Sequence, residues 1–571
     1  MPRRRVHLAP APPDLRRDDR AEADRTAPAG VVGDAPDRRL QALAAAVDDD
    51  VARGLADLRD ELGVPAGFPP DVLAEARAAA GSAPGDLADA TDIPFVTIDP
   101  PGSRDLDQAV HLERRGSGYR VRYAIADVAS WVRPGGAVDT EARRRVVTLY
   151  APDGRTPLHP PELSEGAASL LAGQDVPALL WTVDLDADGT PTAVDVRRSR
   201  VRSRAQLTYD EVQRSLDDDT ADEPLRLLRD VGRLRQEAER ERGGITLPTP
   251  EQVVERTDGH WELVSRATLD AEEWNAQISL LTGMSAARIM LDGRVGVLRT
   301  LPPSDPRDVA RLRRAADALG VTWPDGAGVG DVVRGLDAAD PAHAALLTEA
   351  TTLLRGAAYV AFDGEVPEQP QHAALAAPYA HTTAPLRRLV DRFVGETCVA
   401  LVAGRDVPDW VRSALPDLPA LMAGGDRRAN EYERGCLDLV EAVLLTGRVG
   451  DVFDGVVVDA HDDRTTGVVQ LRAPVVRGKV DGADLPVGRH VQVRLVEASA
   501  AHRRVRFTLD GVPAADGALP DDGVPTDGAP TDDGVPTADG APTDEGVPTA
   551  GAGDGHDASD ARGGDRAATQ G

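Results

Sequence analysis

The sequence has very few lysines, cysteines and aromatic residues, and each scarcity limits what the chain can do. Lys479 is the only lysine among 571 residues, so nearly every candidate phosphate-binding cation is an arginine, whose planar group can bind bidentately. Aromatic residues make up 3%, so any aromatic that stacks on a base must be individually placed. The two cysteines, Cys398 and Cys436, are too few for a disulfide framework or a structural zinc site.

Long apolar runs are also missing. None approaches the roughly 18 residues that span a bilayer. The start, MPRRRVHLAPAPP, has basic residues but no apolar stretch behind them, which is unlike a secretory signal. We therefore expect a cytoplasmic protein with no membrane partner, acting as a monomer.

The net charge of −30 argues at first against a nucleic-acid partner, because phosphate binding favours a positive surface. Much of that charge lies after Gly511, where the chain is rich in Asp and nearly free of Arg. The total therefore decides nothing about binding, and the local placement of arginines must decide it.

Composition divides the chain into five parts. Residues 1–38 lack periodicity and are predicted to be disordered. Residues 39–92 form a predicted helical lead-in, in which apolar residues recur at spacings of three and four, followed by the helix-like PPDVLAEARAAA. The repeating GVPT and GAPT units of residues 512–571, with Asp-rich spacers, predict an acidic low-complexity tail.

Residues 93–445 are predicted to form one large mixed α/β domain. PFVTID is a short apolar strand, DLDQAVHLER and YRVRYAIADVASWV form a hairpin across RGSG, and a second hairpin turns at ADGT. Helices are expected at EPLRLLRDVGRLRQEAERERGG, WNAQISLLTGMSAARIML and PLRRLVDRFVGETCVALVAG.

Residues 446–511 contain five short alternating strands, which predict a small OB-type β-barrel. Such barrels commonly bind single-stranded nucleic acid. Together with the preceding domain, this places the chain in the α+β class, with disordered termini.

The segment IDPPGSRDLDQAV carries a cluster of carboxylates. Asp105 and Asp107 are two residues apart, so on an extended strand their side chains point to the same face. The Pro-Pro-Gly turn can fold Asp99 back towards them. Three converging carboxylates repel one another unless a cation neutralises them, and hard oxygen ligands suit Mg²⁺ or Mn²⁺. A solvated acidic turn or a lone Ca²⁺ loop would fit the same spacing, so spacing alone leaves these readings open.

Four motifs in order resemble the ribonuclease II / ribonuclease R (RNB) family of exoribonucleases, in a subtype with a short N-terminus. FVTIDPPGSRDLDQAV followed by YAIADVASWV resembles the opening of the family's catalytic domain. TLYAPDGRTPLHPPELSEGAASLLAG, YAHTTAPLRRLVDR and RRANEYERGCLD resemble three later family segments. The matches span roughly residues 93 to 440, and the barrel fits the RNA-binding domain that usually follows.

The resemblance implies a 3′-to-5′ hydrolytic exoribonuclease that degrades single-stranded RNA processively to nucleoside 5′-monophosphates with Mg²⁺, or with Mn²⁺ as the alternative. It implies that Asp99, Asp105 and Asp107 hold the metal and orient the attacking water, with Asp107 the most critical.

Further site residues follow from the same resemblance. Tyr150 would pack against the terminal nucleotide, and Arg387 would contact the phosphate near the scissile bond. Arg388 is the weaker choice beside Arg387, and Glu433 would bind substrate or form a surface ion pair. His381 and Asp391 are interpreted as supporting or structural residues.

One departure from the family pattern matters most. Gln108 stands where the family usually has a fourth carboxylate, so one negative charge is lost, although a carboxamide oxygen can still ligate a hard cation. Ala384 is a milder change in the block that carries Arg387. Residues 1–92 lack the aromatic strand motifs of the cold-shock barrels found in many relatives.

Two alternatives to an active exoribonuclease stay open. The first is a catalytically weak or inactive RNA-binding regulatory protein on the same fold, which the substitution at Gln108 motivates. The second is an unrelated metal-dependent phosphatase or nuclease with a chance D-x-D pair, but it does not explain the later motifs. Cleavage that depends on a divalent metal would distinguish an active exoribonuclease from the RNA-binding protein. A preference for RNA chain length would distinguish it from the phosphatase.

Overall fold

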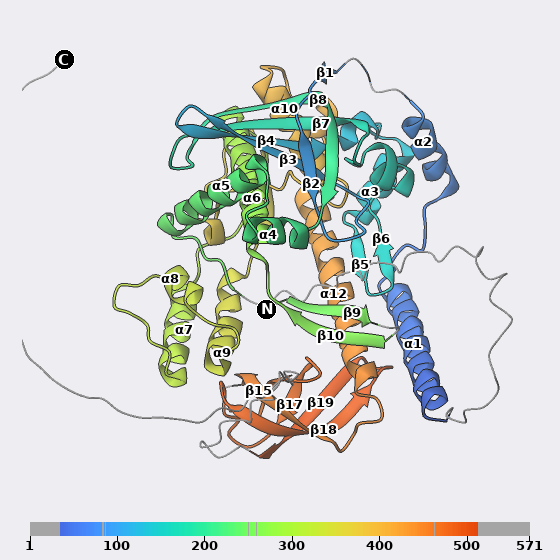
Figure 1. Cartoon of the computed structure of the whole chain (residues 1–571), viewed down its shortest axis with the longest axis vertical. Coiled ribbons are helices and arrows are strands. Elements are labelled where there is room, and N and C mark those ends of the chain that lie inside the picture. Colours follow the sequence, from blue (N-terminus) through green and yellow to red (C-terminus); the bar gives the residue numbers. More distant parts are fainter. Residues whose placement is uncertain are drawn as a thin grey trace, which may run out of the picture. The chain divides into compact units, whose positions relative to one another are not determined.

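The computed structural model describes residues 35–82, 85, 87–248, 251–257, 260–461 and 463–511 (Figure 1). The predicted disorder of residues 1–38 falls outside these ranges up to residue 34, and the whole predicted tail, 512–571, falls outside them too. Among the described residues, no helix is both long and apolar enough to traverse a bilayer. The expected cytoplasmic location and monomeric state stay predictions.

Two helices precede the sheet. Helix α1 (Ala35–Glu61) begins a few residues before its predicted start, and α2 (Pro70–Ala80) begins with Pro at its first turn. Val51, Leu55 and Leu58 of α1 are buried in a cluster shared with the long helix α12 (Leu418–Leu444). The apolar spacing read from the sequence therefore does mark the buried side of α1.

The two predicted hairpins and the short apolar strand make one six-stranded sheet in the order β1-β8-β2-β3-β4-β7. Strand β8 pairs with β7 through most of its length and with β2 at its end, so the sheet curls round on itself. Its strands are β1 (Ala88–Asp89), β2 (Phe95–Ile98), β3 (Gln108–Arg115), β4 (Gly118–Ala126), β7 (Asp175–Leu185) and β8 (Pro191–Leu207).

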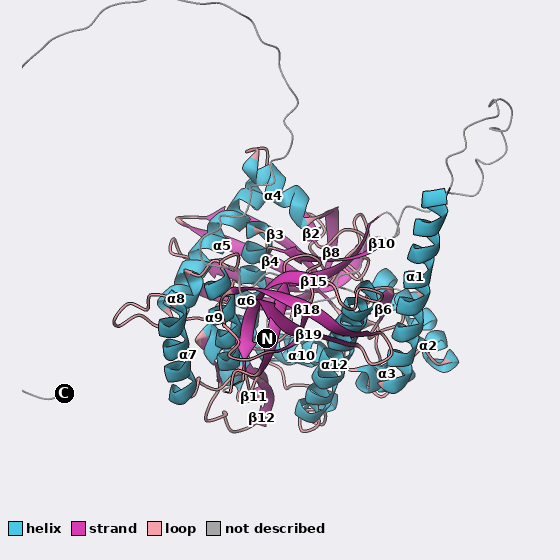
Figure 2. Ribbon diagram, turned by 90° about the horizontal axis from the view of Figure 1, so that it is seen from below, coloured by secondary structure: helices cyan, strands magenta, loops and turns pink. Residues whose placement is uncertain are grey.

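Helices cover this sheet and bury its apolar side chains (Figures 1 and 2). Helix α5 packs on β3, α6 packs on α5 and β4, and α10 packs on β8 and α6. Twelve consecutive residues at the start of α10 are buried, which makes it the central helix of the core. The bounds are α3 (Ala137–Arg145), α4 (Tyr209–Asp217), α5 (Glu223–Glu241), α6 (Asp270–Gly293) and α10 (Leu389–Val402).

Several elements between residues 149 and 412 were not predicted individually. Helices α7 and α9 pack on each other with a small apolar core of their own. These elements are β5 (Leu149–Ala151), β6 (Gly154–Thr156), β9 (Glu251–Thr257), β10 (His260–Arg266), β11 (Val295–Thr300), α7 (Pro306–Leu319), α8 (Val329–Arg334), α9 (Pro341–Ala350), β12 (Ala358–Asp363), β13 (Gln371–His372), β14 (Ala377–Pro378) and α11 (Asp409–Arg412).

The five C-terminal strands close into a barrel in the order β15-β16-β17-β19-β18, as predicted. Buried apolar residues alternate with exposed ones along each strand, and Phe453 and Phe507 meet edge to face inside. Helix α12 leads into the barrel, where Glu441 accepts a hydrogen bond of 3.0 Å from the backbone N–H of Arg477. The strands are β15 (Val452–Ala460), β16 (Thr466–Leu471), β17 (Arg477–Asp481), β18 (His490–Ser499) and β19 (Arg504–Gly511).

Gly283 of α6 is a close-packed point that supports the loop before α10. A Cβ there would overlap the Tyr379 ring and stand 2.6 Å from the Ala380 carbonyl oxygen. We expect Gly283→Ala to lower the free energy of unfolding by about 1–3 kcal/mol, because neither neighbour can yield easily. Urea denaturation measures the change.

Gly424 of α12 is the matched control, because its Cβ would meet nothing closer than 3.9 Å. Gly424→Ala should leave stability unchanged or raise it by about 0.5–1 kcal/mol. Equal losses in both variants would show that the contact at Gly283 does not limit stability.

Candidate active site

Asp99 directly follows β2, whose Phe95 and Ile98 are buried. Its N–H donates to the carbonyl of Leu207, and the chain then turns at Gly102, whose φ of +76° favours glycine. The Oδ2 atom of Asp99 is buried without a hydrogen-bond partner. Burial raises the pKa of Asp99 to about 7, an effect that Arg387 opposes and Asp105 reinforces. A buried, unsatisfied carboxylate oxygen is costly, so Asp99 is a candidate ligand for a proton or a cation.

Asp105 and Asp107 lie in the loop that leads into β3, and not on a strand as the sequence had suggested. Leu106 between them is fully buried and is held by hydrogen bonds with Ser169 and Leu170, so the loop is fixed at its centre. The D-x-D pair was predicted to lie on a strand, but it lies in this anchored loop.

Asp105 forms an ion pair with Arg155, which also pairs with Glu165 at 2.8 Å. Arg155 lies in β6, inside the motif APDGRTP, and no sequence pattern singled it out. Its guanidinium neutralises one of the three carboxylates in the structure as it stands.

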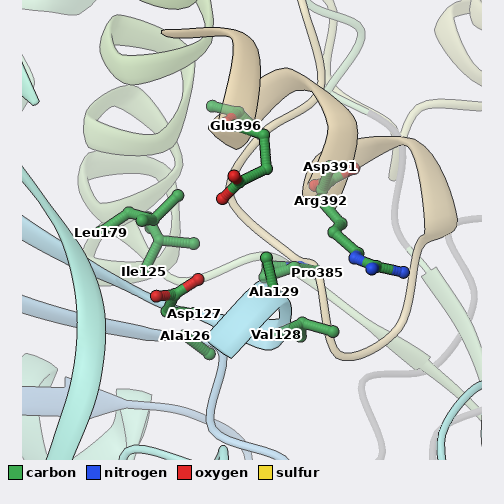
Figure 3. Close-up of a pocket in the computed structure, with 11 residues that line it drawn as sticks. Ile125, Ala126, Asp127, Val128, Ala129, Leu179, Pro385, Asp391, Arg392 and Glu396 are labelled. Atoms are coloured by element: carbon green, nitrogen blue, oxygen red, sulfur yellow. The ribbon is translucent and has the colours of Figure 1, made fainter. Parts of the chain in front are cut away.

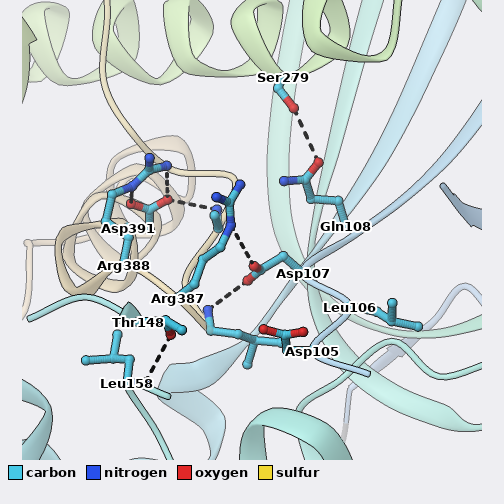
Figure 4. Close-up of polar contacts among 12 residues, drawn as sticks. Asp105, Leu106, Asp107, Gln108, Thr148, Leu158, Ser279, Arg387, Arg388 and Asp391 are labelled. Atoms are coloured by element: carbon cyan, nitrogen blue, oxygen red, sulfur yellow. Dashed lines mark hydrogen bonds and ion pairs between the residues drawn. The ribbon is translucent and has the colours of Figure 1, made fainter. Parts of the chain in front are cut away.

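Asp107 is the most buried of the three aspartates, at 4% exposed. Its Oδ1 accepts a hydrogen bond of 2.7 Å from the N–H of Leu386, and its Oδ2 lies 3.5 Å from Nε of Arg387 (Figure 4). Burial raises the pKa of Asp107, and the nearby Arg387 opposes the rise. Residues far apart in sequence thus meet at one carboxylate.

The segment that carries Arg387 is held from both sides. Thr148 donates to the carbonyl of Arg387, and Leu389 donates to the carbonyl of Val146. This pairing places Tyr150 of β5 next to the arginine, and burial raises the pKa of Tyr150 to about 12. The structure therefore brings Tyr150, Arg387 and the aspartates together, as the resemblance led us to expect, while their roles stay predictions.

Arg388 faces a different partner. It makes two hydrogen bonds, of 2.5 and 2.8 Å, to Asp391, which also accepts from the N–H of Ala384 (Figure 4). The side chain of Arg387, in contrast, is 48% exposed. The geometry agrees with ranking Arg387 above Arg388 as a phosphate contact, and it gives Asp391 a structural part.

His381 and Glu433 differ in their surroundings. His381 is hydrogen-bonded to the Tyr359 hydroxyl at 2.7 Å, and burial lowers its pKa, so it stays neutral. Glu433 is half-buried on α12, near Cys436. Its predicted part in substrate binding is not resolved by these contacts and stays a prediction.

The side chain of Gln108 points away from Asp107 (Figure 4). Its Oε1 accepts hydrogen bonds from the Tyr123 hydroxyl and, at 3.3 Å, from Ser279. Neither partner was predicted, because Tyr123 reads as a core residue of β4 and Ser279 as one of many small residues of α6. The oxygen that was expected to bind a metal is engaged elsewhere.

A small cavity lies between the end of β4, Pro385 and α10 (Figure 3). Asp127 from the end of β4 and Glu396 from α10 face it, and Arg198 pairs with both carboxylates. Arg392 lines the same cavity and pairs with Asp139 at 2.7 Å. These ion pairs fix α10 against the sheet, and the described contacts of the cavity show no sign of substrate binding.

Whether the site suits a divalent cation depends on its donors. Three carboxylates, one of them with a buried oxygen that lacks a partner, form the hard donor set that Mg²⁺ or Mn²⁺ prefers. Across the described ranges, however, no three His, Cys, Asp or Glu side chains are grouped so that they could hold a metal ion. The chemistry of the donors fits a cation, while Asp105 and Asp107 are each paired with an arginine in this structure.

Comparison with known proteins identifies the two structured parts. The RNB domain family matches residues 87–403, and the family of RNase II-type exonuclease C-terminal S1 domains matches residues 451–510. The chain is 27% identical over 491 residues to ribonuclease R of Escherichia coli (strain K12), covering 78% of this chain and 59% of that protein. It is 31% identical over 339 residues to a probable exosome complex exonuclease RRP44 of Caenorhabditis elegans, covering 56% and 35%.

Solved structures share the fold. Mycoplasma genitalium RNase R in complex with ribose-methylated single-stranded RNA superposes with a TM-score of 0.72 at 18% identity, covering 81% of this chain and 78% of that one. Yeast Ssd1, described as a pseudonuclease, superposes with a TM-score of 0.57 at 16% identity, covering 72% and 52%. The chain spans about three fifths of the length of the E. coli relative.

The raised pKa of Asp99 predicts a pH-dependent stability in metal-free protein. A folded-state pKa near 7, against about 4 in the unfolded chain, means that the folded state holds the extra proton. The extra proton therefore adds to the free energy of unfolding. That stability is fully present below about pH 4 and is lost as the pH rises through 7. The difference in stability between Asp99→Asn and the original chain should therefore shift in favour of Asp99→Asn as the pH rises from 4 to 8, by roughly 1–4 kcal/mol.

Urea denaturation in EDTA at several pH values tests this expectation. The difference between the two proteins, rather than either curve alone, isolates Asp99 from the other titrating groups. A difference that stays constant across the range would contradict a raised pKa at Asp99.

Proposed function

Because the chain belongs to the RNB family, we propose that it is a divalent-metal-dependent 3′-to-5′ exoribonuclease that degrades single-stranded RNA processively to nucleoside 5′-monophosphates. One observation carries the proposal: Leu386 and Arg387 dock on the buried carboxylate of Asp107, which sets a half-exposed arginine side chain beside the aspartates. A cation and a carboxylate cluster side by side suit a substrate that is a phosphodiester.

We propose that Asp99, Asp105 and Asp107 hold Mg²⁺ or Mn²⁺. When bound, the cation would supply charge that activates water and stabilises the leaving oxygen. Asp105 must first leave Arg155, since that ion pair occupies it in the present structure. The buried, partnerless oxygen of Asp99 is the donor that supports this proposal most directly.

The remaining residues bind and orient the RNA. The side chain of Arg387 is half-exposed and would contact a phosphate oxygen, while Asp107 restrains its direction. Tyr150, held beside it by the pairing of residues 146–148 with 387–389, offers a ring for the terminal nucleotide. Arg155, once released from Asp105, becomes a second guanidinium at the site.

The barrel offers a place for the RNA further from its 3′ end. A groove with a volume of about 410 Å³ runs over β15, β16, β17 and β19. Lys479, Arg504, Arg506 and His461 line it, and Arg506 pairs with Asp481 at 2.7 Å. Basic side chains without an aromatic platform suit contacts to the RNA backbone, which carry little sequence preference.

A second function has one structural observation in its favour. Asp105 and Asp107 are paired with arginines, and Gln108 replaces a carboxylate, so the protein could bind RNA without cleaving it. One protein of similar fold is described as a pseudonuclease, so the fold alone does not determine activity.

An exonuclease assay decides between the two functions. A 5′-labelled single-stranded RNA of about thirty nucleotides, long enough to reach both parts, is incubated with Mg²⁺, Mn²⁺ or EDTA. We expect metal-dependent shortening from the 3′ end to a small limit product. Asp107→Asn should reduce the rate by about a hundredfold or more, because it alters the carboxylate that orients Arg387 and the metal.

Two controls sharpen the assay. Gln236→Ala changes a glutamine of α5 that bonds Glu273, and it should retain the full rate. A DNA strand of the same sequence should be spared, because it lacks the 2′-hydroxyl groups. Tight RNA binding without shortening under either metal would overturn the exoribonuclease proposal and leave the RNA-binding function.

A further inference from the structure

Gln108 occupies a position where a carboxylate was expected, yet its oxygen does not face the aspartates. Oε1 accepts from both the Tyr123 hydroxyl and Ser279 Oγ, and those two hydroxyl oxygens are 2.8 Å apart. The three side chains come from β3, β4 and α6 and form one hydrogen-bonded group. The two hydroxyl protons are shared among the three oxygens, so Oε1 accepts at least one of them inside the protein.

Burial explains why this arrangement is stable. Tyr123 is 1% exposed, and a buried hydroxyl that loses its acceptor destabilises the folded state. Burial also raises the pKa of Tyr123, so that its hydroxyl keeps the proton and remains a donor. The carboxamide oxygen of Gln108 is the acceptor that this donor uses.

The orientation of the oxygen fixes that of the nitrogen. Nε2 carries two N–H donors and no acceptor, so it cannot ligate a cation. Figure 4 shows this nitrogen on the side of Gln108 that faces Arg387, above Asp107. The carboxamide nitrogen is therefore turned towards the side on which Arg387, whose side chain is 48% exposed, lies against Asp107.

We propose that Gln108 binds an oxygen of the RNA phosphate together with Arg387, and that it is not a metal ligand. Tyr123 and Ser279 are positioning residues that hold the amide in this direction. The inference rests on the proposed function, since it assigns a substrate contact within that site. The reversed amide would turn Oε1 towards the aspartates and make Gln108 a metal ligand, and the experiment separates the two.

The first arm measures RNA affinity without metal. A fluorescein-labelled single-stranded RNA is titrated with the full chain in EDTA, with its last phosphodiester either native or replaced by a neutral methylphosphonate. Gln108→Ala should weaken binding of the native RNA about tenfold, as expected for a hydrogen bond to a charged group. The methylphosphonate should weaken binding to the original chain but add little to the loss in Gln108→Ala, because both changes remove the same contact.

The second arm measures metal affinity without RNA. Mn²⁺ is titrated calorimetrically into the metal-free proteins. Gln108→Ala should bind Mn²⁺ within about twofold of the original chain, whereas Asp99→Asn should bind it much more weakly. A loss of Mn²⁺ affinity in Gln108→Ala equal to that in Asp99→Asn, with RNA affinity unchanged, would overturn the proposal. The proposal would also be overturned if the losses of RNA affinity caused by Gln108→Ala and by the methylphosphonate added in full, because the two changes would then remove different contacts.

Two further variants keep the test independent of folding. Gln108→Glu retains acceptor oxygens for Tyr123 and Ser279 but lacks the N–H donors, so it should also lose RNA affinity by tenfold or more. Ser279→Ala should weaken RNA binding by a smaller factor and leave Mn²⁺ affinity unchanged. If Ser279 had only a structural role, its loss would change both affinities or neither. Unaltered RNA affinity in Gln108→Glu would contradict the proposal.

The failure of this inference is distinct from failure of the proposed function. Both arms measure binding and need no turnover. A chain that cleaves RNA while Gln108→Ala leaves RNA affinity unchanged would refute the inference alone. A chain that binds RNA through Gln108 without cleaving it would refute the proposed activity alone.

Discussion

The hydrogen bond from Leu386 N–H to the carboxylate of Asp107 joins two halves of the domain that the chain delivers separately. One half is the aspartate loop, anchored by the buried Leu106; the other is the segment before α10, whose own position depends on Asp391 and on the pairing with residues 146–148. Asp107 is nearly fully buried, so this bond and the nearby Arg387 are what make its charge tolerable. Removing them would leave a buried carboxylate unsatisfied and Arg387 unguided.

The balance of charge at the site follows from the scarcity of lysine. Arginines 155 and 387 oppose Asp105 and Asp107, while Asp99 is left with a partnerless oxygen and a raised pKa. A guanidinium can hold a carboxylate and later a phosphate through the same planar group, so the metal-free site is stable without being blocked permanently. The replacement of a carboxylate by Gln108 fits this balance, since it removes one repulsive charge and adds donors.

Sequence patterns predicted the elements well where one face is buried and poorly where contacts are distant. Alternation and turn residues marked β3, β4, β7, β8 and the five barrel strands, and helical patterns marked α1, α5, α6 and α10. The D-x-D pair was placed on a strand, but the burial of Leu106 holds it in a loop. The motifs named Tyr150 and Arg387. Nothing local pointed to Arg155, Tyr123 or Ser279, because each acts through a partner at least 15 residues away.

Hydrogen exchange at the Leu386 amide tests the central claim most directly, because that amide is the donor to Asp107. In the original chain we predict strong protection at Leu386 although it lies outside any helix or strand. In Asp107→Ala, exchange at residues 384–388 should accelerate by at least tenfold, while α10 beyond Phe393 keeps its protection. An amide that exchanges equally fast in both proteins would contradict the account, because the Arg387 segment would then not depend on Asp107.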